Sequence, residues 1–345
     1  MHHFITERSN VQVRKVQFKS CLHDACKNCR GDSASFISCS NLFTQVEMIL
    51  MLRTNREKLV KLSVMGEVAS PTTKNVYNIS ATGTPCILPG VGGIAYNLRI
   101  GDLACGWEAD HVEPCVSTTN KENDARSGNA ANTAYNILSC IGNQAVIANG
   151  DAKGGMGTVT GKHGGIEHVL IDFKPEIFDR LLIGDKIQIK AYGTGLKLLD
   201  FPDIKLINLD PCLLDVINPQ INGEMLEVPV THVIPANIMG SGLGANQVNS
   251  GDYDIQLFDD STVKQFRLEN LRLGDLVAII DADHSYGRIY RKGAVTVGVI
   301  VHANCVTAGH GPGVTSLMTS ANGKIIPQIN PKANLASLLK LRADI

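Results

Sequence analysis

One short phrase recurs three times along the chain and constrains its fold more than any other feature. It reads LRIGD at 98–102, LLIGD at 181–185 and LRLGD at 271–275, and each copy precedes a strand-like run. Glycine in a turn supplies a positive φ angle, and an aspartate beside it can bond back to the local backbone. Three such turn-to-strand units predict many short strands, which is typical of barrel-like or sandwich-like sheets.

The composition agrees with a β-rich globular protein. Apolar residues make up 44% of the 345 residues and aromatic residues only 5%, while 33 glycines supply tight turns. Helical patterns are few: a segment capped by Ser127, residues 172–182, and segments opened by Asp210-Pro211 and Asn330-Pro331. We therefore predict an α+β, β-rich fold of barrel- or sandwich-like sheets with a few short helices and two domains.

The first fifty residues differ from the rest. Residues 1–50 are rich in Ser, Asn, Lys, His and Cys without sustained periodicity, so we expect a poorly ordered N-terminal extension. The alternative is half of a zinc site, at Cys26 and Cys29 with Cys21 and His23 nearby. Cys39 stands alone and gives no second pair.

The body divides near residue 220. NPQING at 218–223 is the best linker candidate. It separates a β-rich N-terminal domain at 51–220 from a β-rich C-terminal domain at 221–345.

Charge and hydropathy exclude several classes of partner. The net charge is −1 without a long basic block, so we expect no nucleic acid. Apolar runs such as Leu276–Ile280 stop far short of the ~20 residues of a transmembrane helix. The N-terminus lacks the apolar run of a signal peptide, and the ten cysteines follow no disulfide pattern. These features favour a cytoplasmic protein with reduced thiols.

Two glycine-rich segments resemble nucleotide-binding loops without meeting their requirements. GGMGTVTGKHGG has Met156 and His163 where a P-loop needs Gly and Ser or Thr. GSGLGA at 240–245 is followed by residues that cannot form the helix on which a dinucleotide phosphate rests. We therefore expect no nucleotide cofactor.

The segment 281–313 concentrates titratable side chains around one apolar strand. Side chains of a strand alternate between faces, so Asp281 and Asp283 are predicted to share one face. His284 and Arg288 follow in a turn. Packing of an ordinary hairpin does not require this concentration, so we predict the wall of a ligand or catalytic pocket.

The same segment ends in a histidine and a glycine-rich loop. Small residues on one face of the strand 294–302 leave room, and His302 closes the end of that face. In TAGHGPG, Gly309, Gly311 and Gly313 allow backbone N–H groups to converge on an anion or oxyanion, with His310 held between these glycines. The alternative is a set of surface turns.

Two further motifs carry candidate residues. In GKHGG, Lys162 and His163 stand between glycines that allow a ligand close to the backbone, with His168 nearby, although a plain hairpin turn gives the same pattern. GWEADHVEP offers four titratable groups, which we interpret as the solvated face of a strand: Glu108, Asp110, His111 and Glu113.

Several of these phrases together resemble the uncharacterised prokaryotic family called domain of unknown function 4438. They include LPGVGGIAYNLRIGD, DHVEP, TGKHGGIEHVLIDF and the long run DADHSYGRIYRKGAVTVGVIVHANCVTAGHGPGVTSLMTS. The resemblance covers roughly residues 51–345. It implies a body of two domains, N-terminal and C-terminal, and no particular reaction.

Two classes of function fit these residues. The first is a hydrolase of a small polar, amide-like substrate, with catalytic Asp281, Asp283, His284 and His310. Substrate-binding residues would be Lys162, His163, Arg288, His302, Gly311 and Gly313. A divalent metal held by His284, His302, His310 and an aspartate is a variant of this hypothesis. The second class is a module that binds a small anion or metabolite without catalysis. In either class we expect a small-molecule ligand and a homo-oligomer.

Overall fold

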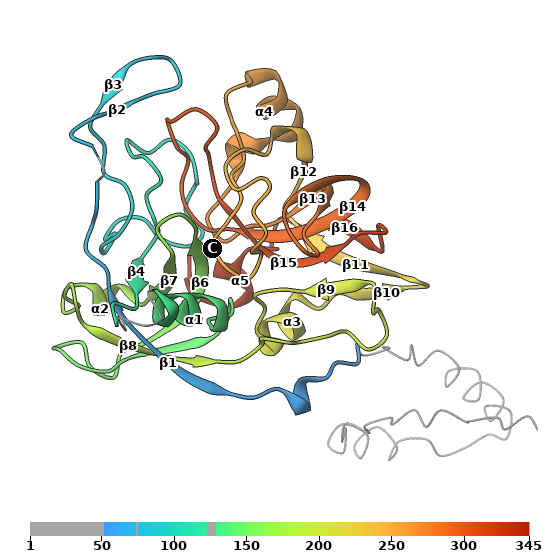
Figure 1. The fold of residues 1–345 in the computed structure, drawn as a ribbon, viewed down its shortest axis with the longest axis horizontal. Coiled ribbons are helices and arrows are strands. Elements are labelled where there is room, and N and C mark those ends of the chain that lie inside the picture. Colours follow the sequence, from blue (N-terminus) through green and yellow to red (C-terminus); the bar gives the residue numbers. More distant parts are fainter. Residues whose placement is uncertain (1–51, 74, 123–128, 345) are drawn as a thin grey trace, which may run out of the picture. The chain divides into compact units, whose positions relative to one another are not determined.

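The computed structural model describes residues 52–73, 75–122 and 129–344. The predicted extension at 1–50, its half zinc-site pattern and the helix cap Ser127 lie outside these residues. The body from Met51 to Ile345 forms one compact unit. Its strands outnumber its short helices (Figure 1), and the predicted β-rich α+β class is confirmed. No helix in the described ranges has the length and apolarity needed to cross a membrane.

Six antiparallel strands from the first half of the body close into a barrel. In order around the barrel they are β1 (Leu62–Val68), β4 (Val116–Thr119), β7 (His168–Phe173), β6 (Met156–His163), β5 (Gln144–Ile147) and β8 (Lys186–Ala191). Strand β8 shows the alternation expected of a barrel wall, because Ile187, Ile189 and Ala191 are buried between more exposed neighbours.

A five-stranded sheet forms the centre of the second half. Its order is β12 (His232–Pro235), β13 (Leu276–Asp283), β14 (Ile289–Ile300), β15 (Val314–Ser320) and β9 (Ile204–Leu206). Strand β9 comes from the first half of the body and pairs with β15, so the two halves share this sheet. The long β13–β14 hairpin carries a bulge between Ile280 and Ala282.

The remaining elements are short. A three-stranded sheet contains β10 (Gln220–Asn222), β11 (Met225–Val230) and β16 (Ile325–Ile329), and a two-stranded ribbon contains β2 (Asn78–Ile79) and β3 (Pro85–Cys86). The α-helices are α1 (Ala130–Leu138), α2 (Pro175–Phe178), α3 (Pro211–Ile217), α4 (Asp260–Phe266) and α5 (Leu335–Leu338). Three 3-10 turns are η1 (Arg56–Lys58), η2 (Ala236–Ile238) and η3 (Leu268–Asn270).

The recurring turn adopts the same structure in all three copies. The glycines have φ angles of 98°, 90° and 85° at Gly101, Gly184 and Gly274. Each aspartate carboxylate accepts a hydrogen bond from the backbone N–H three residues earlier: Asp102 from Arg99, Asp185 from Leu182 and Asp275 from Arg272. Strands β8 and β13 follow the second and third copies directly. The predicted turn-to-strand unit is therefore confirmed for these two copies.

One predicted helix start agrees with the structure, whereas another helix start and the predicted linker differ from it. Asp210 caps α3 as expected, since its side chain accepts from the Cys212 N–H. The last helix starts later than predicted and is capped by Asn334 instead of Asn330. Residues 218–223 are structured, because strand β10 within them pairs with β11.

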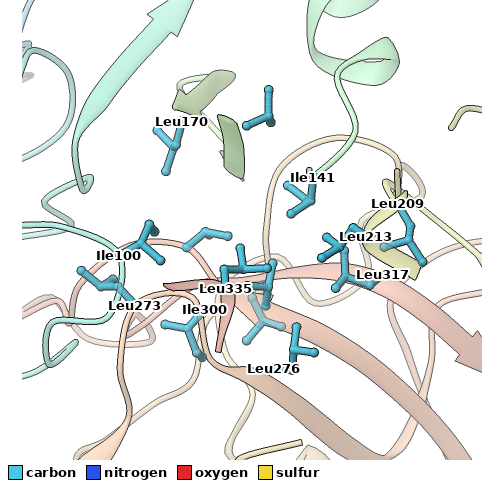
Figure 2. Packing of buried hydrophobic residues seen from close by; sticks show 14 of the residues in the cluster. Ile100, Ile141, Leu170, Leu209, Leu213, Leu273, Leu276, Ile300, Leu317 and Leu335 are labelled. Atoms are coloured by element: carbon cyan, nitrogen blue, oxygen red, sulfur yellow. The ribbon is translucent and has the colours of Figure 1, made fainter. Parts of the chain in front are cut away.

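One hydrophobic cluster runs through both halves of the body (Figure 2). Leu170 on the barrel strand β7 belongs to the same cluster as Leu276 and Ile300 on the five-stranded sheet. Ile141 and Leu335 lie between these regions in the figure. A shared core fixes the barrel against the sheet and thereby holds loops from both in one place.

Candidate functional site

Loops from the barrel and from the five-stranded sheet enclose a cavity of about 590 Å³. This volume is in the ordinary range for a small-molecule site. Its lining includes the following titratable residues: His111, His163, Asp252, Asp254, Arg288 and His310. The first two belong to the N-terminal half and the others to the C-terminal half, so the cavity needs both.

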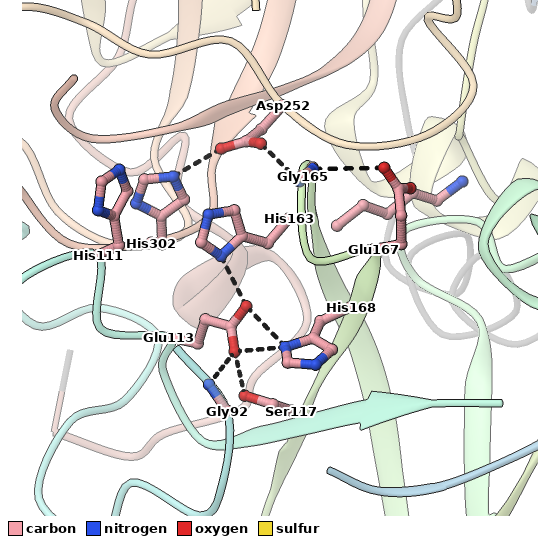
Figure 3. Close-up of polar contacts among 12 residues, drawn as sticks. Gly92, His111, Glu113, Ser117, His163, Gly165, Glu167, His168, Asp252 and His302 are labelled. Carbon is pink, nitrogen blue, oxygen red and sulfur yellow. Dashed lines mark hydrogen bonds and ion pairs between the residues drawn. The ribbon is translucent and has the colours of Figure 1, made fainter. Parts of the chain in front are cut away.

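A buried carboxylate fixes two histidines of the β6–β7 hairpin. His163 and His168 face each other across this hairpin, and the predicted hairpin turn is thereby present. The Nδ1 atom of His163 lies 2.6 Å from Glu113 Oε1, and that of His168 lies 2.9 Å from Glu113 Oε2 (Figure 3). Because Nδ1 of His163 donates to the carboxylate, its Nε2 is left with a lone pair directed elsewhere.

Glu113 is itself held by donors from the barrel. The Gly92 N–H donates to Oε2 at 2.7 Å, and the Ser117 hydroxyl donates to the same oxygen. Burial alone would raise the pKa of Glu113, but hydrogen bonds from His163 and His168 outweigh it and lower this pKa well below its ordinary value. Glu113 is therefore an ionised acceptor that orients two imidazoles.

His302 and Asp252 lie within ion-pair distance of each other (Figure 3). His302 follows β14, and its Nδ1 lies 2.9 Å from the Ala303 carbonyl oxygen, to which it donates. Its Nε2 lies 2.6 Å from Asp252 Oδ2. Both of these atoms are buried and lack a hydrogen-bond partner among the described residues. A ligand-type atom of His163 lies within 4.8 Å of both.

A second group of potential ligands, formed by His111, Asp254 and His310, lies beside the group of His163, Asp252 and His302. His111 Nδ1 lies 3.3 Å from Asp110 Oδ1, while its Nε2 lies 3.0 Å from His310 Nδ1. Asp254 Oδ2 is 2.8 Å from His310 Nδ1 and 3.7 Å from His111 Nε2. The His111 ring is 5.3 Å from that of His302, centroid to centroid, so the two groups adjoin (Figure 3).

The carboxylates make this region strongly attractive to positive charge. Burial alone would lower the pKa of both His111 and His302. Hydrogen bonds with Asp110 and Asp254 nevertheless raise the pKa of His111 to about 12, and Asp252 together with Asp254 raises that of His302 to about 10. A site with this electrostatic character favours a cation over an anion beside the imidazoles.

The glycines of the predicted anion nest have a steric role. A Cβ at Gly313 would collide with Asp252 Oδ2 and His302 Nε2, and one at Gly311 would collide with the Ile255 carbonyl oxygen. Neither glycine has a positive φ angle, and neither belongs to the cavity lining in the described chain. Gly313 therefore lets the aspartate and the imidazole approach each other.

The two predicted basic residues lie in different surroundings. Lys162 is fully buried, and its ammonium donates at 2.7 Å to both Asn208 Oδ1 and the Asn249 carbonyl oxygen. Burial lowers its pKa to about 8. Arg288 lines the cavity although only 4% of its surface is exposed. Its Nη2 donates to the Ser250 carbonyl oxygen at 3.0 Å, and its Nε has no partner within the described part.

Asp281, Asp283 and His284 lie outside the cavity lining of the described chain. Asp281 accepts from the Gly293 N–H at 2.6 Å and has a φ of 64°, because it is the bulged residue of the β13–β14 hairpin. Asp283 accepts from the Ser285 N–H and pairs with Arg291. The expected gathering of these carboxylates around the imidazoles at 302 and 310 is therefore wrong.

His284 packs inside the sheet. Its side chain is fully buried, and its Nδ1 lies 2.6 Å from the Ser316 hydroxyl oxygen. Burial lowers its pKa to about 3, so the ring is neutral. This surrounding suits a packing residue better than a base that exchanges protons with a substrate.

Sequence reasoning missed five residues of the site. They are Asp110, His111, Glu113, Asp252 and Asp254. The interpretation of GWEADHVEP as a solvated strand face is wrong, since Asp110 and Glu113 are 8% and 2% exposed and the segment is a loop. His111 adopts a φ of 60°, which is rare for a non-glycine residue and typical of functional loops. For Asp252 and Asp254, the sequence signal was the pair of alternating aspartates in GDYD at 251–254.

Comparisons with known proteins agree with this arrangement in two halves. Residues 77–215 match the model described as domain of unknown function (DUF4438), N-terminal, and residues 216–339 match its C-terminal counterpart. A solved structure described as the crystal structure of TM1086 is similar, with 46% sequence identity and a TM-score of 0.78 over 83% of this chain and 98% of that one. No curated protein matches the chain. On both the family models and this structural likeness, the chain belongs to the DUF4438 family.

Proposed function

We propose that this protein is a metal-dependent hydrolase acting on a small polar, amide-like substrate that carries a carboxylate. The observation that carries the proposal is the contact between His302 Nε2 and Asp252 Oδ2. These buried atoms lie 2.6 Å apart. Such a contact is unfavourable unless a positive charge lies between the two atoms, either a proton on Nε2, which the raised pKa of His302 favours without metal, or a metal cation bound to both.

The ligand set suits a divalent transition metal. His163, His302 and Asp252 supply two imidazole nitrogens and one carboxylate oxygen, and the cavity beside them leaves room for water or substrate. Glu113 behind His163 and the Ala303 carbonyl behind His302 orient both rings, as in known metal sites. A divalent cation in this position lowers the pKa of a coordinated water and polarises a substrate carbonyl.

Arg288 supports a substrate with a carboxylate. Its guanidinium is almost fully buried, yet no carboxylate in the described chain lies within ion-pair distance of it. A buried charge without a partner is costly, so an anionic ligand group is the natural partner. Planar guanidinium binds planar carboxylate through two parallel hydrogen bonds.

Anion capture without catalysis is the second candidate. It is favoured by Arg288 alone, because a carboxylate can bind there without any metal. It gives no role to the grouping of His163, Asp252 and His302, whose ligand atoms lie within 4.8 Å of one another, and we therefore rank it second.

Metal analysis and turnover together test the hydrolase. We expect the purified full chain to contain a transition metal and to cleave N-acyl amino acids or cyclic amides bearing a carboxylate. Asp252→Asn should lower both metal content and kcat/KM by at least about 100-fold. Arg288→Gln should raise KM for carboxylate substrates roughly 10–100-fold while leaving the metal bound.

His232→Gln serves as the matched control, because His232 lies on β12, outside the cavity lining of the described chain. Full hydrolytic activity of the metal-free chain would refute the metal-dependent reaction. Tight binding of the same carboxylates without turnover, with or without metal, would favour the capture module.

A further inference from the structure

We propose that the cavity holds a second divalent cation, bound by His111, Asp254 and His310, and that Asp254 bridges the two metals. This inference rests on the first cation site proposed above and adds a site that the hydrolase does not require, since one metal suffices to activate water.

The three side chains have the spacing of metal ligands. Asp254 Oδ2 lies 2.8 Å from His310 Nδ1 and 3.7 Å from His111 Nε2. Around a tetrahedral cation with bonds of ~2.0–2.1 Å, ligand atoms are about 3.3 Å apart. Small adjustments of surface-accessible His310 would therefore complete the site.

The facing imidazole nitrogens are the second observation. His111 Nδ1 lies 3.3 Å from Asp110 Oδ1, and its Nε2 forms a 3.0 Å hydrogen bond with His310 Nδ1; with a cation bound, Nδ1 would keep the proton and Nε2 would be the ligand atom. This arrangement repeats the one found for His163, where a buried carboxylate also stands behind the ring. An acid behind an imidazole is the usual outer partner of a metal-ligating histidine.

Asp254 faces both sites with different oxygens. Its Oδ2 is directed to His310 and His111, whereas its Oδ1 lies 3.5 Å from His302 Nε2. A carboxylate with one oxygen on each of two cations is the geometry of a bridging ligand. Paired metals in hydrolytic sites lie ~3.5–4 Å apart, a separation that one carboxylate spans.

The charges of the region fit two divalent cations. Four carboxylates are buried around the imidazoles, each no more than 8% exposed: Asp110, Glu113, Asp252 and Asp254. With neutral imidazoles they carry four negative charges in a low-dielectric region; the Arg288 guanidinium at the same cavity offsets one of them, and divalent cations can offset the rest. The competing arrangement has protonated imidazoles and no metal.

Manganese provides the test, because two bridged Mn(II) ions are spin-coupled and one ion is not. The full chain is stripped with EDTA, dialysed and titrated with Mn(II), and the bound metal is counted by elemental analysis and followed by EPR. We expect two Mn(II) per chain and a coupled spectrum.

His310→Ala should retain one Mn(II) with an uncoupled spectrum. Its side chain is 33% exposed, so the variant should fold, as near-UV circular dichroism of the metal-free protein will show. Asp254→Asn should likewise lose the coupling, and His232→Gln should keep two ions.

The failures of the two proposals differ in this experiment. One Mn(II) per chain that disappears in Asp252→Asn and persists unchanged in His310→Ala would overturn the second site and leave the hydrolase intact. Absence of bound Mn(II) from the wild-type chain at millimolar concentration would overturn both and favour the protonated cluster.

Discussion

Glu113 decides the orientation of the imidazoles although it is not a ligand in the proposed site. It accepts from His163 and His168 on one side and from the Gly92 N–H and Ser117 on the other. A carboxylate with this many donors has little freedom to move. It therefore fixes which nitrogen of His163 is protonated and where the other one points.

Replacing this carboxylate should weaken the metal site without abolishing the fold. For Glu113→Gln we expect the affinity for the first cation to fall roughly 10–100-fold, because the amide cannot accept from both imidazoles. The measurement is the dissociation constant for Co(II) followed by its visible absorption. Ser117→Ala removes one donor and keeps the carboxylate, so it should change the constant by much less. Equal effects of the two variants would contradict a positioning role.

At the scale of elements, the repeated turns show two different reasons why a glycine is needed: its positive φ angle and the lack of space for a Cβ atom. Gly184 has a φ of 90° with open space where a Cβ would project. Gly274 has a similar φ of 85°, but a Cβ there would lie 2.6 Å from Ile100 Cγ2 and 3.2 Å from Asn334 Oδ1. Both positions need a residue that tolerates a positive φ angle, but only Gly274 also needs a residue without a Cβ atom.

Alanine at these two positions should therefore have unequal effects. We expect Gly184→Ala to lower the free energy of unfolding by about 1–2 kcal/mol, the cost of a positive φ in a residue with a Cβ. Gly274→Ala should cost more, by roughly a further 1–3 kcal/mol for the crowded contacts. Urea unfolding of both variants measures the difference. If the two losses coincide, the packing argument fails.

At the scale of the whole molecule, the two family regions are interlocked. Strand β9 of the first region pairs with β15 of the second. On the barrel side, Thr315 donates to the Lys162 carbonyl, and Gly161 packs against Val301. Separating the regions would expose a sheet edge and part of a common core.

We accordingly expect residues 51–345 to unfold in one cooperative transition, even after EDTA has removed any metal that joins the regions. Trp107, the single tryptophan, reports on the first region through its fluorescence. Pulsed hydrogen exchange of β14 reports on the second. The two unfolding curves should coincide in urea. Two well-separated midpoints would show instead that the regions are independent domains.

The bulge at Asp281 explains why one prediction from the sequence was misleading. Strict alternation placed Asp281 and Asp283 on one face of a strand beside the later histidines. The extra residue breaks that alternation and turns Asp281 toward the Gly293 N–H. The local sequence does not predict this bulge, because the bulge arises from the pairing of β13 with β14.

The residues of the cavity were predictable only in part. His163, Arg288, His302 and His310 were found because glycines or a strand end accompany them. Three of them line the cavity, and His302 is buried beside it against Asp252. Asp252 and Asp254 belong to a polar loop, where acids are normally solvated. Their burial results from a contact between distant segments, shown by the bridge of Asp254 with Gly313.

By itself, the sequence determined the local devices of this protein: the glycine–aspartate turns, the short strands and the cap at Asp210. These depend on the φ preferences and side-chain acceptors of a few consecutive residues. The tertiary structure alone decided which acids stand behind which imidazoles. That choice depends on how a closed barrel and a five-stranded sheet pack on one core, which brings together residues nearly two hundred positions apart, such as His111 and His310.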